Sequence, residues 1–187
     1  MKNYKVVVIG VSAGGIVTLS KLFAVLKSDF SLPIIVVQHL HPTQNFEHVH
    51  VLNNVSPLPV VEAGDKQAYD PGSIYLSPPD YHLQLERNGV FSLSIDEKVN
   101  HCRPSVDILF ESAVDVFLGE VIGVVLTGAN CDGAKGLLQI SKAGGLTIVE
   151  DPLTAECPYM PKAALELLEA DYVLKAEDIG IKLNYLC

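Results

Sequence analysis

The sequence predicts an α/β fold: a doubly wound, mostly parallel sheet with helices on both faces and an antiparallel hairpin excursion near 66–99. Two observations lead to this prediction. Short β-branched runs alternate with segments of helical periodicity along most of the chain, as in repeated βαβ units. Several runs are apolar throughout, which is typical of parallel strands buried on both faces. A length of 187 residues favours one domain, 1–187, with a single large core.

The first part of the chain contains three expected strands. The run 6–9 is continuously apolar, and a glycine-rich turn leads from it into a helix of apolar periodicity over 14–27. Pro33 opens a second buried strand, 34–37, since proline is tolerated at the start of a strand. A short helix near 43–53 and a third strand at 58–62 follow.

The middle of the chain breaks this rhythm. The runs 81–87 and 90–95 alternate in side-chain character, as antiparallel strands do. Asn88-Gly89 joins them and suits a two-residue type I′ turn, in which both positions need positive φ. We therefore expect 66–99 to form an antiparallel excursion at one edge of the sheet.

The alternation returns after this segment. Ser105 can cap a helix that runs to about residue 118, with apolar residues on one face. Pro161 begins a later helix, where its missing N–H is not needed. The other expected elements are strands at 121–126, 146–149 and 172–174, helices over 134–142, 161–169 and from 176 onward, and a loop at 150–158.

Composition excludes several classes of function. The net charge is −9, with 13 basic residues against 22 acidic ones, and no run of Lys or Arg offers a footprint for nucleic acid. The apolar runs 6–9 and 33–37 are too short for membrane insertion, and the N-terminus lacks the pattern of a signal peptide. The four cysteines lack the spacing of a zinc site or disulfide framework, so we expect a reduced, cytoplasmic location.

Three polar residues follow expected strands, where ligands bind in an open parallel sheet. Ser12 lies in the glycine-rich turn after the first strand, His39 ends the second, and Asp132 lies in the loop after 121–126. A histidine can remove the proton of a serine hydroxyl, and a carboxylate behind the ring fixes its tautomer. The trio therefore predicts a serine hydrolase, with oxyanion donors at the helix N-terminus beside Ser12.

Other interpretations of these residues stay open at this point. Ser12 can be a plain helix cap, His39 a structural residue and Asp132 part of an ordinary turn. A dinucleotide-binding loop lacks its second glycine at Ser12 and an acid at the end of the second strand. The pairs His39/His41 and His48/His50 have no carboxylate or cysteine nearby at ligand spacing, so we expect no metal and no organic cofactor.

The chain resembles the protein-glutamate methylesterases of bacterial chemotaxis, the CheB-type catalytic domains. Each matching motif is modest alone, and together they cover about residues 5 to 175 in the expected order. The matching stretches are Ile9-Gly-Val-Ser12-Ala-Gly-Gly15, Gln38-His39, Ile74-Tyr-Leu-Ser-Pro78, Arg103-Pro-Ser-Val-Asp107 with Leu109-Phe110, Leu126-Thr-Gly128 through Asp132-Gly133, and Met160-Pro161-Lys162-Ala163-Ala164.

The resemblance implies hydrolysis of glutamate γ-methyl esters on the cytoplasmic helices of chemoreceptors, with release of methanol, and deamidation of receptor glutamines. It implies Ser12 as nucleophile, His39 as general base and acid, and Asp132 as the orienting carboxylate. The N–H of Ala13 and a backbone donor near Ala129 should bind the oxyanion. Arg103 could meet an acidic receptor segment, or equally form a structural ion pair with Asp107.

Two departures from the family pattern affect regulation and substrate choice. The usual N-terminal receiver domain and linker are not in this sequence, so we expect a separate receiver-domain protein or methyltransferase as partner. The residue after the nucleophile is commonly Thr and is Ala13 here, which keeps the backbone donor and loses a hydroxyl. A non-catalytic binding or regulatory module of the same fold is therefore the alternative function.

Overall fold

A parallel sheet of seven strands forms the centre of the computed structural model, which describes residues 3–39 and 47–187. The strand order is β3-β4-β2-β1-β7-β8-β9, and every neighbouring pair is parallel. The strands are β1 (Val6–Val11), β2 (Ile34–Gln38), β3 (Val60–Glu62), β4 (Ile74–Leu76), β7 (Val121–Val125), β8 (Leu146–Glu150) and β9 (Tyr172–Leu174). This sheet confirms the predicted fold class.

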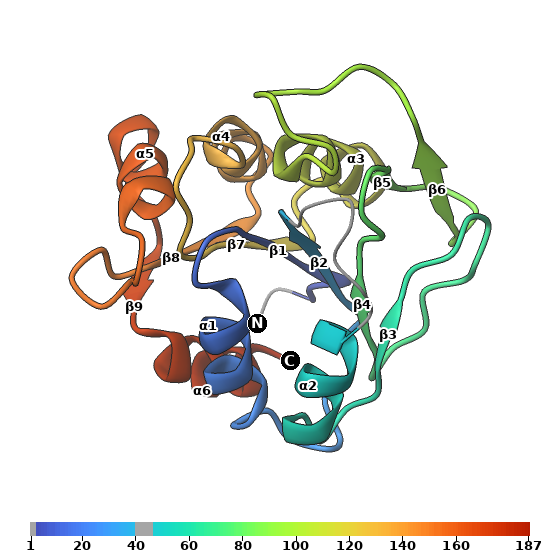
Figure 1. The fold of residues 1–187 in the computed structure, drawn as a ribbon, viewed down its shortest axis with the longest axis horizontal. Helices are drawn as coiled ribbons and strands as arrows, with labels where there is room; N and C mark the ends of the chain where they lie inside the picture. Colours follow the sequence, from blue (N-terminus) through green and yellow to red (C-terminus); the bar gives the residue numbers. More distant parts are fainter. Residues whose placement is uncertain (1–2, 40–46) are drawn as a thin grey trace.

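Helices cover both faces of the sheet (Figure 1). One face is covered by α3 (Val106–Phe117), α4 (Ala134–Lys142) and α5 (Tyr159–Leu167). The other face is covered by α1 (Gly15–Phe23), α2 (Glu47–Val55) and α6 (Ala176–Leu186). No described helix is long and apolar enough to cross a membrane.

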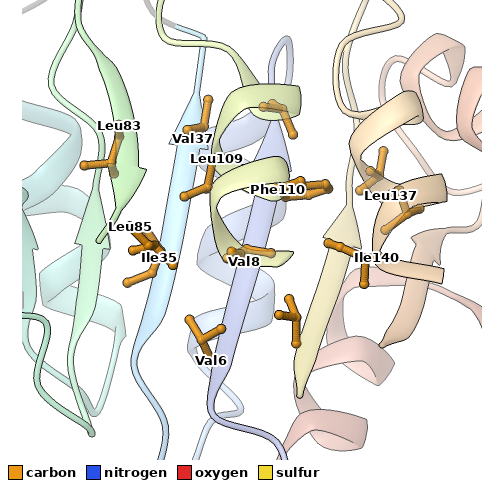
Figure 2. Close-up of a cluster of buried hydrophobic side chains, with 14 of the residues drawn as sticks. Val6, Val8, Ile35, Val37, Leu83, Leu85, Leu109, Phe110, Leu137 and Ile140 are labelled. Carbon is orange, nitrogen blue, oxygen red and sulfur yellow. The ribbon is translucent and has the colours of Figure 1, made fainter. Parts of the chain in front are cut away.

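The central strands are buried on both sides, which explains their continuous apolar runs. Along β1, Val6 and Val8 belong to the core under α3 and α4, while Val7 and Ile9 belong to the core under α1 and α6. Figure 2 shows the first of these cores, in which Phe110 of α3 lies among strand side chains. Because successive side chains of a strand point to opposite faces, each strand contributes to both cores.

The strand order reverses at β1. From β1 the chain proceeds to β2 on one side, and it returns to β7 on the other side of β1. The carboxyl ends of these three strands therefore flank the switch point, where an open α/β sheet offers a crevice.

The segment 66–99 departs from the prediction in one respect. Ile74–Leu76 is a parallel strand of the main sheet, between β2 and β3, and was not expected as a strand. The expected hairpin is present as β5 (His82–Leu85) and β6 (Phe91–Ser94), but it forms a separate two-stranded sheet that packs on α3. An apolar run of three residues between polar turns is too short to give a periodic signal.

The hairpin turn also differs from the prediction. Gly89 has a φ of 82°, whereas Asn88 is not in the left-handed region, so the two-residue type I′ turn is wrong. The N–H of Gly89 donates to the carbonyl of Glu86, and Glu86 N–H donates to Val90. A three-residue loop that ends on a left-handed glycine accounts for this pattern.

The helices differ from expectation mainly at their ends. α1 ends at Phe23, four residues earlier than expected, and α5 begins at Tyr159 instead of Pro161. The expected first residues of the second helix, 43–46, and His41 lie outside the described residues.

Candidate active site

Ser12 leaves β1 at the carboxyl edge of the sheet. Its N–H donates to the carbonyl of Thr127 over 2.9 Å, and its carbonyl accepts the N–H of Gly15 over 3.0 Å. The backbone of Ser12 is therefore fixed from the segment after β7 on one side and from the start of α1 on the other. Gly14 between them has a φ of 79°, a left-handed conformation that suits glycine.

Gly128 gives the Ser12 side chain its space. A Cβ atom at Gly128 would lie 2.8 Å from the Ser12 Cβ and would overlap the Met160 sulfur, so the packing here favours glycine. The side chain of Met160 is buried, and Gly128 therefore lies between α5 and the side chain of Ser12.

Thr127 ties the loops around Ser12 together. Its hydroxyl donates to the carbonyl of Ala13 over 2.9 Å and accepts the N–H of Cys157 over 2.8 Å. Its own N–H donates over 2.7 Å to the carboxylate of Glu150, and burial raises the pKa of that carboxyl. Neither Ala13 nor Ala129 uses its N–H in a hydrogen bond with the described residues, and both are exposed. Two backbone donors are thus free beside Ser12.

His39 stands level with Ser12 on the neighbouring strand. Val11 pairs with Gln38, and the N–H of His39 donates to the Val11 carbonyl over 3.0 Å. The ring nitrogen Nε2 lies 2.9 Å from Oδ2 of Asp132. Burial would lower the pKa of His39, but hydrogen bonds to Asp132 and Cys102 outweigh it and raise the pKa to about 9.

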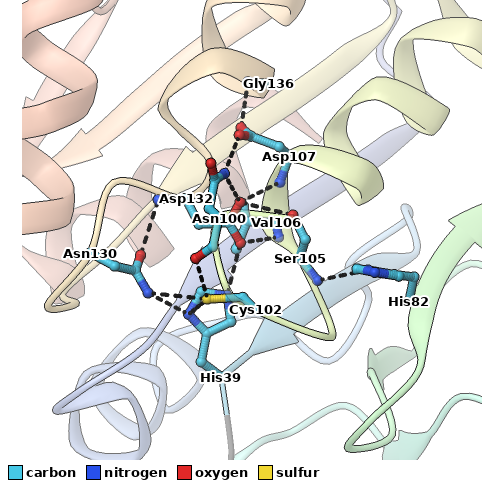
Figure 3. Close-up of polar contacts among 10 residues, drawn as sticks. All are labelled: His39, His82, Asn100, Cys102, Ser105, Val106, Asp107, Asn130, Asp132 and Gly136. Atoms are coloured by element: carbon cyan, nitrogen blue, oxygen red, sulfur yellow. Dashed lines mark hydrogen bonds and ion pairs between the residues drawn. The ribbon is translucent and has the colours of Figure 1, made fainter. Parts of the chain in front are cut away.

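Asp132 is buried and accepts hydrogen bonds from backbone as well as side chains (Figure 3). The N–H of Val106, at the start of α3, donates over 2.6 Å, and the hydroxyl of Ser105 donates over 2.8 Å. Asn100 Nδ2 donates over 2.9 Å. Burial alone would raise the pKa of Asp132, but the hydrogen bonds from His39, Asn100 and Val106 lower it. The positive end of α3 further favours the anion.

Ser105 occupies the expected N-cap position of α3 but does not cap the helix with its side chain. Its hydroxyl bonds Asp132, and the Asp132 carboxylate takes the capping role from the loop before α4. Asp107 of α3 does the same for α4, since its Oδ1 accepts the N–H of Gly136 over 2.7 Å. Burial raises the pKa of Asp107. The two helices are thus capped reciprocally by carboxylates.

The described part of the chain brings Ser12, His39 and Asp132 to one edge of the sheet, but no hydrogen bond joins the Ser12 hydroxyl to His39. Instead, Nδ1 of His39 lies 3.0 Å from Nδ2 of Asn130 and 3.8 Å from Sγ of Cys102. The serine-histidine contact that catalysis needs is therefore a prediction, and the histidine-aspartate contact is present.

Arg103 lies away from this cluster. Its guanidinium bonds Oδ1 of Asp80 through Nε and Nη2, and it also bonds the carbonyls of Ile95 and Asp96. The expected structural ion pair exists, but its partner is Asp80 and not Asp107. Arg103 holds the segment that precedes α3, and a contact with substrate stays a prediction.

Several residues of the site were not expected from the sequence. Asn100 reaches Asp132 and Asp107 across the chain, and no local pattern announces such a contact. Asn130 had a local signal: its Oδ1 accepts the N–H of Asp132 two residues later, an Asx turn typical of this residue type.

Among the residues that the structure describes, His39, Cys102 and Asp132 form a group that could hold a metal ion, since their ligating atoms lie within 4.8 Å of one another. The oxygens of Asp132 already accept protein hydrogen bonds, and one of the donors is the His39 ring itself. We therefore interpret these residues as an acid–base chain and not as metal ligands.

Comparison with known proteins assigns the family. The CheB methylesterase family model matches residues 7–183. A relative from Leptospira interrogans, described as a putative protein-glutamate methylesterase/protein-glutamine glutaminase, is 46% identical over 178 residues, which are 95% of this chain and 92% of that protein. The protein-glutamate methylesterase/protein-glutamine glutaminase of Thermotoga maritima is 40% identical over 182 residues, which are 96% of this chain but 53% of that protein.

The fold agrees with the sequence comparison. The crystal structure of the Thermotoga maritima CheB methylesterase catalytic domain matches with a TM-score of 0.95 at 39% identity, and the match covers 98% of this chain and 99% of that one. The resemblance stated from the motifs is confirmed: the chain belongs to the CheB methylesterase family.

Proposed function

We propose that this chain hydrolyses γ-methyl esters of glutamate side chains on chemoreceptors and releases methanol. The observation that carries the proposal is the 2.9 Å hydrogen bond between His39 and the buried Asp132, level with Ser12 at the switch point of the sheet. The names of the relatives from Leptospira interrogans and Thermotoga maritima support the substrate class.

The reaction proceeds in two halves. Ser12 Oγ attacks the ester carbon and gives its proton to Nδ1 of His39, and the oxyanion accepts hydrogen bonds from the N–H groups of Ala13 and Ala129. The intermediate collapses to an acyl-serine, and methoxide leaves with the proton from His39 as methanol. Water then attacks the acyl-serine, its proton passes through His39 to Ser12, and the glutamate carboxylate is released. With a glutamine side chain the first leaving group is ammonia.

The surroundings of the site suit an extended protein substrate. A cavity of about 340 Å³ lies beside Asn100 and Asp107 and is rimmed by Lys135 and Lys162. A second cavity of about 320 Å³ is lined by Ala129 and Glu156 and shares Lys162 with the first. The linings carry Lys135 and Lys162 together with Asp107, Glu156 and Glu166, so charged groups of either sign on a substrate find a partner there.

The test is methanol release from methylated receptor. Ser12→Ala should abolish release, a loss of several orders of magnitude, while the far-ultraviolet circular dichroism spectrum and melting temperature stay unchanged. Cys131→Ala, on an exposed neighbour of Asp132, is the matched control and should retain activity. Appreciable release by Ser12→Ala would overturn the assignment.

The alternative, a non-catalytic binding or regulatory module, makes the opposite prediction. Such a module would leave Ser12 unlabelled by an organophosphonate probe and would bind a partner protein regardless of the Ser12→Ala change. Labelling of the wild type but not of Ser12→Ala excludes it. A separate receiver-domain protein or methyltransferase in the cytoplasm remains the expected regulatory partner, and co-purification would detect it.

A further inference from the structure

The nitrogen of His39 that must accept the Ser12 proton already has a partner, the side chain of Asn130. The orientation of this amide is fixed, because its oxygen accepts the N–H of Asp132 over 3.0 Å and an N–H can only donate. The amide nitrogen Nδ2 therefore faces Nδ1 of His39 over 3.0 Å (Figure 3).

This contact determines the tautomer of His39. An amide nitrogen is a donor only, so Nδ1 must be the acceptor and carry the lone pair. The ring proton then lies on Nε2, where it is donated to Oδ2 of Asp132 over 2.9 Å. A proton on Nε2 and a lone pair on Nδ1 is the neutral form that can take the proton of Ser12.

We propose that Asn130 is a positioning residue that holds His39 in the Nε2–H tautomer and opposes protonation at Nδ1. The proposal rests on the proposed function for its catalytic meaning, because it concerns the base of that reaction. The tautomer and the protonation of the His39 ring, however, are properties of the folded protein and can be measured without substrate.

The charged and titratable groups around the ring favour protonation of His39, whereas Asn130 opposes it. Among the described residues, Asp132 faces Nε2 from the loop after β7, and Cys102 lies 3.8 Å from Nδ1 in the segment before α3. Asp107 of α3 connects to Asp132 through Asn100. The hydrogen bonds of His39 to Asp132 and Cys102 raise its pKa to about 9 against the effect of burial.

If Nδ1 of His39 were protonated, its N–H would face the NH₂ group of Asn130, and two hydrogen-bond donors would point at each other. The amide of Asn130 could turn its oxygen toward the new N–H, but Asp132 N–H would then face an NH₂ group. Asn130 therefore makes the imidazolium less favourable by roughly the worth of one hydrogen bond, which corresponds to about one pH unit in the His39 titration.

The contact also links the base to the loop that carries the acid. Asn130 and Asp132 stand two residues apart, and the Asx turn holds both side chains toward His39 from the same loop. Until the reaction begins, the Asn130 amide keeps the lone pair of His39 Nδ1 directed into the site. The Ser12 hydroxyl then takes the place of the amide at Nδ1.

The experiment is a nuclear magnetic resonance titration of His39 in ¹⁵N-labelled protein that carries Ser12→Ala, so that no turnover is involved. Above its titration, the ring should show an imine-type Nδ1 and a protonated Nε2. Asn130→Ala should raise the apparent pKa by about one pH unit, and Asn130→Asp should raise it further, because a carboxylate accepts from Nδ1–H. Cys131→Ala, on the same loop, should leave the titration where it is.

The rate provides a second readout in protein with Ser12 intact. Asn130→Ala should lower kcat/KM about tenfold at neutral pH, and the loss should shrink as the pH approaches the shifted pKa. A merely structural role would lower the rate equally at every pH. An unchanged or lowered His39 pKa in both Asn130 variants, or a protonated Nδ1 in the neutral ring, overturns the proposal. If the wild type released no methanol but His39 titrated as predicted, the proposed function would be rejected and the positioning role of Asn130 would stand.

Discussion

At the scale of single residues, Asp132 combines two tasks. Its carboxylate orients the His39 ring, and it accepts the N–H groups that begin α3. Within the described part of the chain, five groups donate to it: His39, Asn100, Ser105, Val106 and Asp107. A carboxylate held by so many donors stays ionised, and the ionised form is the one that stabilises an imidazolium during proton transfer.

The pH dependence of the reaction follows from the His39–Asp132 pair. The base must be neutral, and its pKa is raised from 6.5 to about 9, so kcat/KM should rise with pH through the neutral range and level off above about 9. Asp132→Asn should move the His39 titration down toward 6.5 and lower the rate by about 10³-fold to 10⁴-fold. A pH–rate profile of the wild type and a resonance titration of the variant measure both effects. A wild-type rate independent of pH between 6 and 9 would contradict this expectation.

The residues of the site that directly follow buried strands could be predicted from the sequence. Ser12, His39 and Asp132 each follow a strand, and parallel strands bring their carboxyl ends together, so their meeting at one edge was predictable. Asn100 and Cys102 meet the same ring from a segment without regular structure, and only the folded chain shows where that segment runs. Asn130 carried a turn signal, but its second contact, with His39, depends on the neighbouring strand.

At the scale of elements, the loop from β7 to α4 is positioned by α5. The N–H of Gly128 donates to Cys157 and its carbonyl accepts the N–H of Met160, each over 2.9 Å. These two hydrogen bonds join the start of α5 to the loop after β7, and the Met160 sulfur fills the space that any larger residue at Gly128 would need.

Replacement of Gly128 can distinguish the effect of its contact with Met160 from the effect of its contact with Ser12. Gly128→Ala should lower the free energy of unfolding by about 1–3 kcal/mol, because its Cβ would overlap the Met160 sulfur and crowd Ser12. The double variant Gly128→Ala/Met160→Ala relieves the overlap with sulfur but not the contact with Ser12. Relative to Met160→Ala alone, urea denaturation should therefore show a smaller loss of stability, while methanol release should remain low. Recovery of full activity in the double variant would show that Ser12 is not crowded.

The elements themselves were predictable to the extent that they are periodic. The long helices and buried strands appeared within a few residues of their expected ends. The strand Ile74–Leu76 was missed because its partner strands, β2 and β3, come from elsewhere in the chain and give a three-residue run its pairing. The helix start at Val106 was correctly expected, but its capping carboxylate comes from Asp132 and not from Ser105, which no local rule predicts.

At the scale of the whole molecule, the site contributes to stability in a pH-dependent way. The folded pKa of His39 is raised, so its contribution is fully present below about 6.5 and is lost as the pH rises through about 9. The folded pKa of Asp132 is lowered, so its contribution is present above about 3.9 and is lost as the pH falls below that value. Together, His39 and Asp132 therefore stabilise the fold most between about pH 3.9 and about pH 6.5.

His39→Gln tests this linkage. The difference in free energy of unfolding between wild type and variant should be largest near pH 5 to 6 and should shrink steadily toward pH 10, as measured by urea denaturation at several pH values. His50→Gln, on an exposed position of α2, is the control for replacement of a histidine. A difference that grows from pH 6 to pH 10 would mean that the folded pKa of His39 is not raised.

The reciprocal capping of α3 and α4 has a consequence for chains that are only partly folded. Each helix starts on a carboxylate from the other's segment, so Asp132 reaches its place only when the two helices have docked. A chain with both helices formed but apart would carry a serine and a histidine without an aligned acid, and it would hydrolyse esters far more slowly than the folded protein. The onset of ester cleavage during refolding should therefore report the docking of α3 on α4.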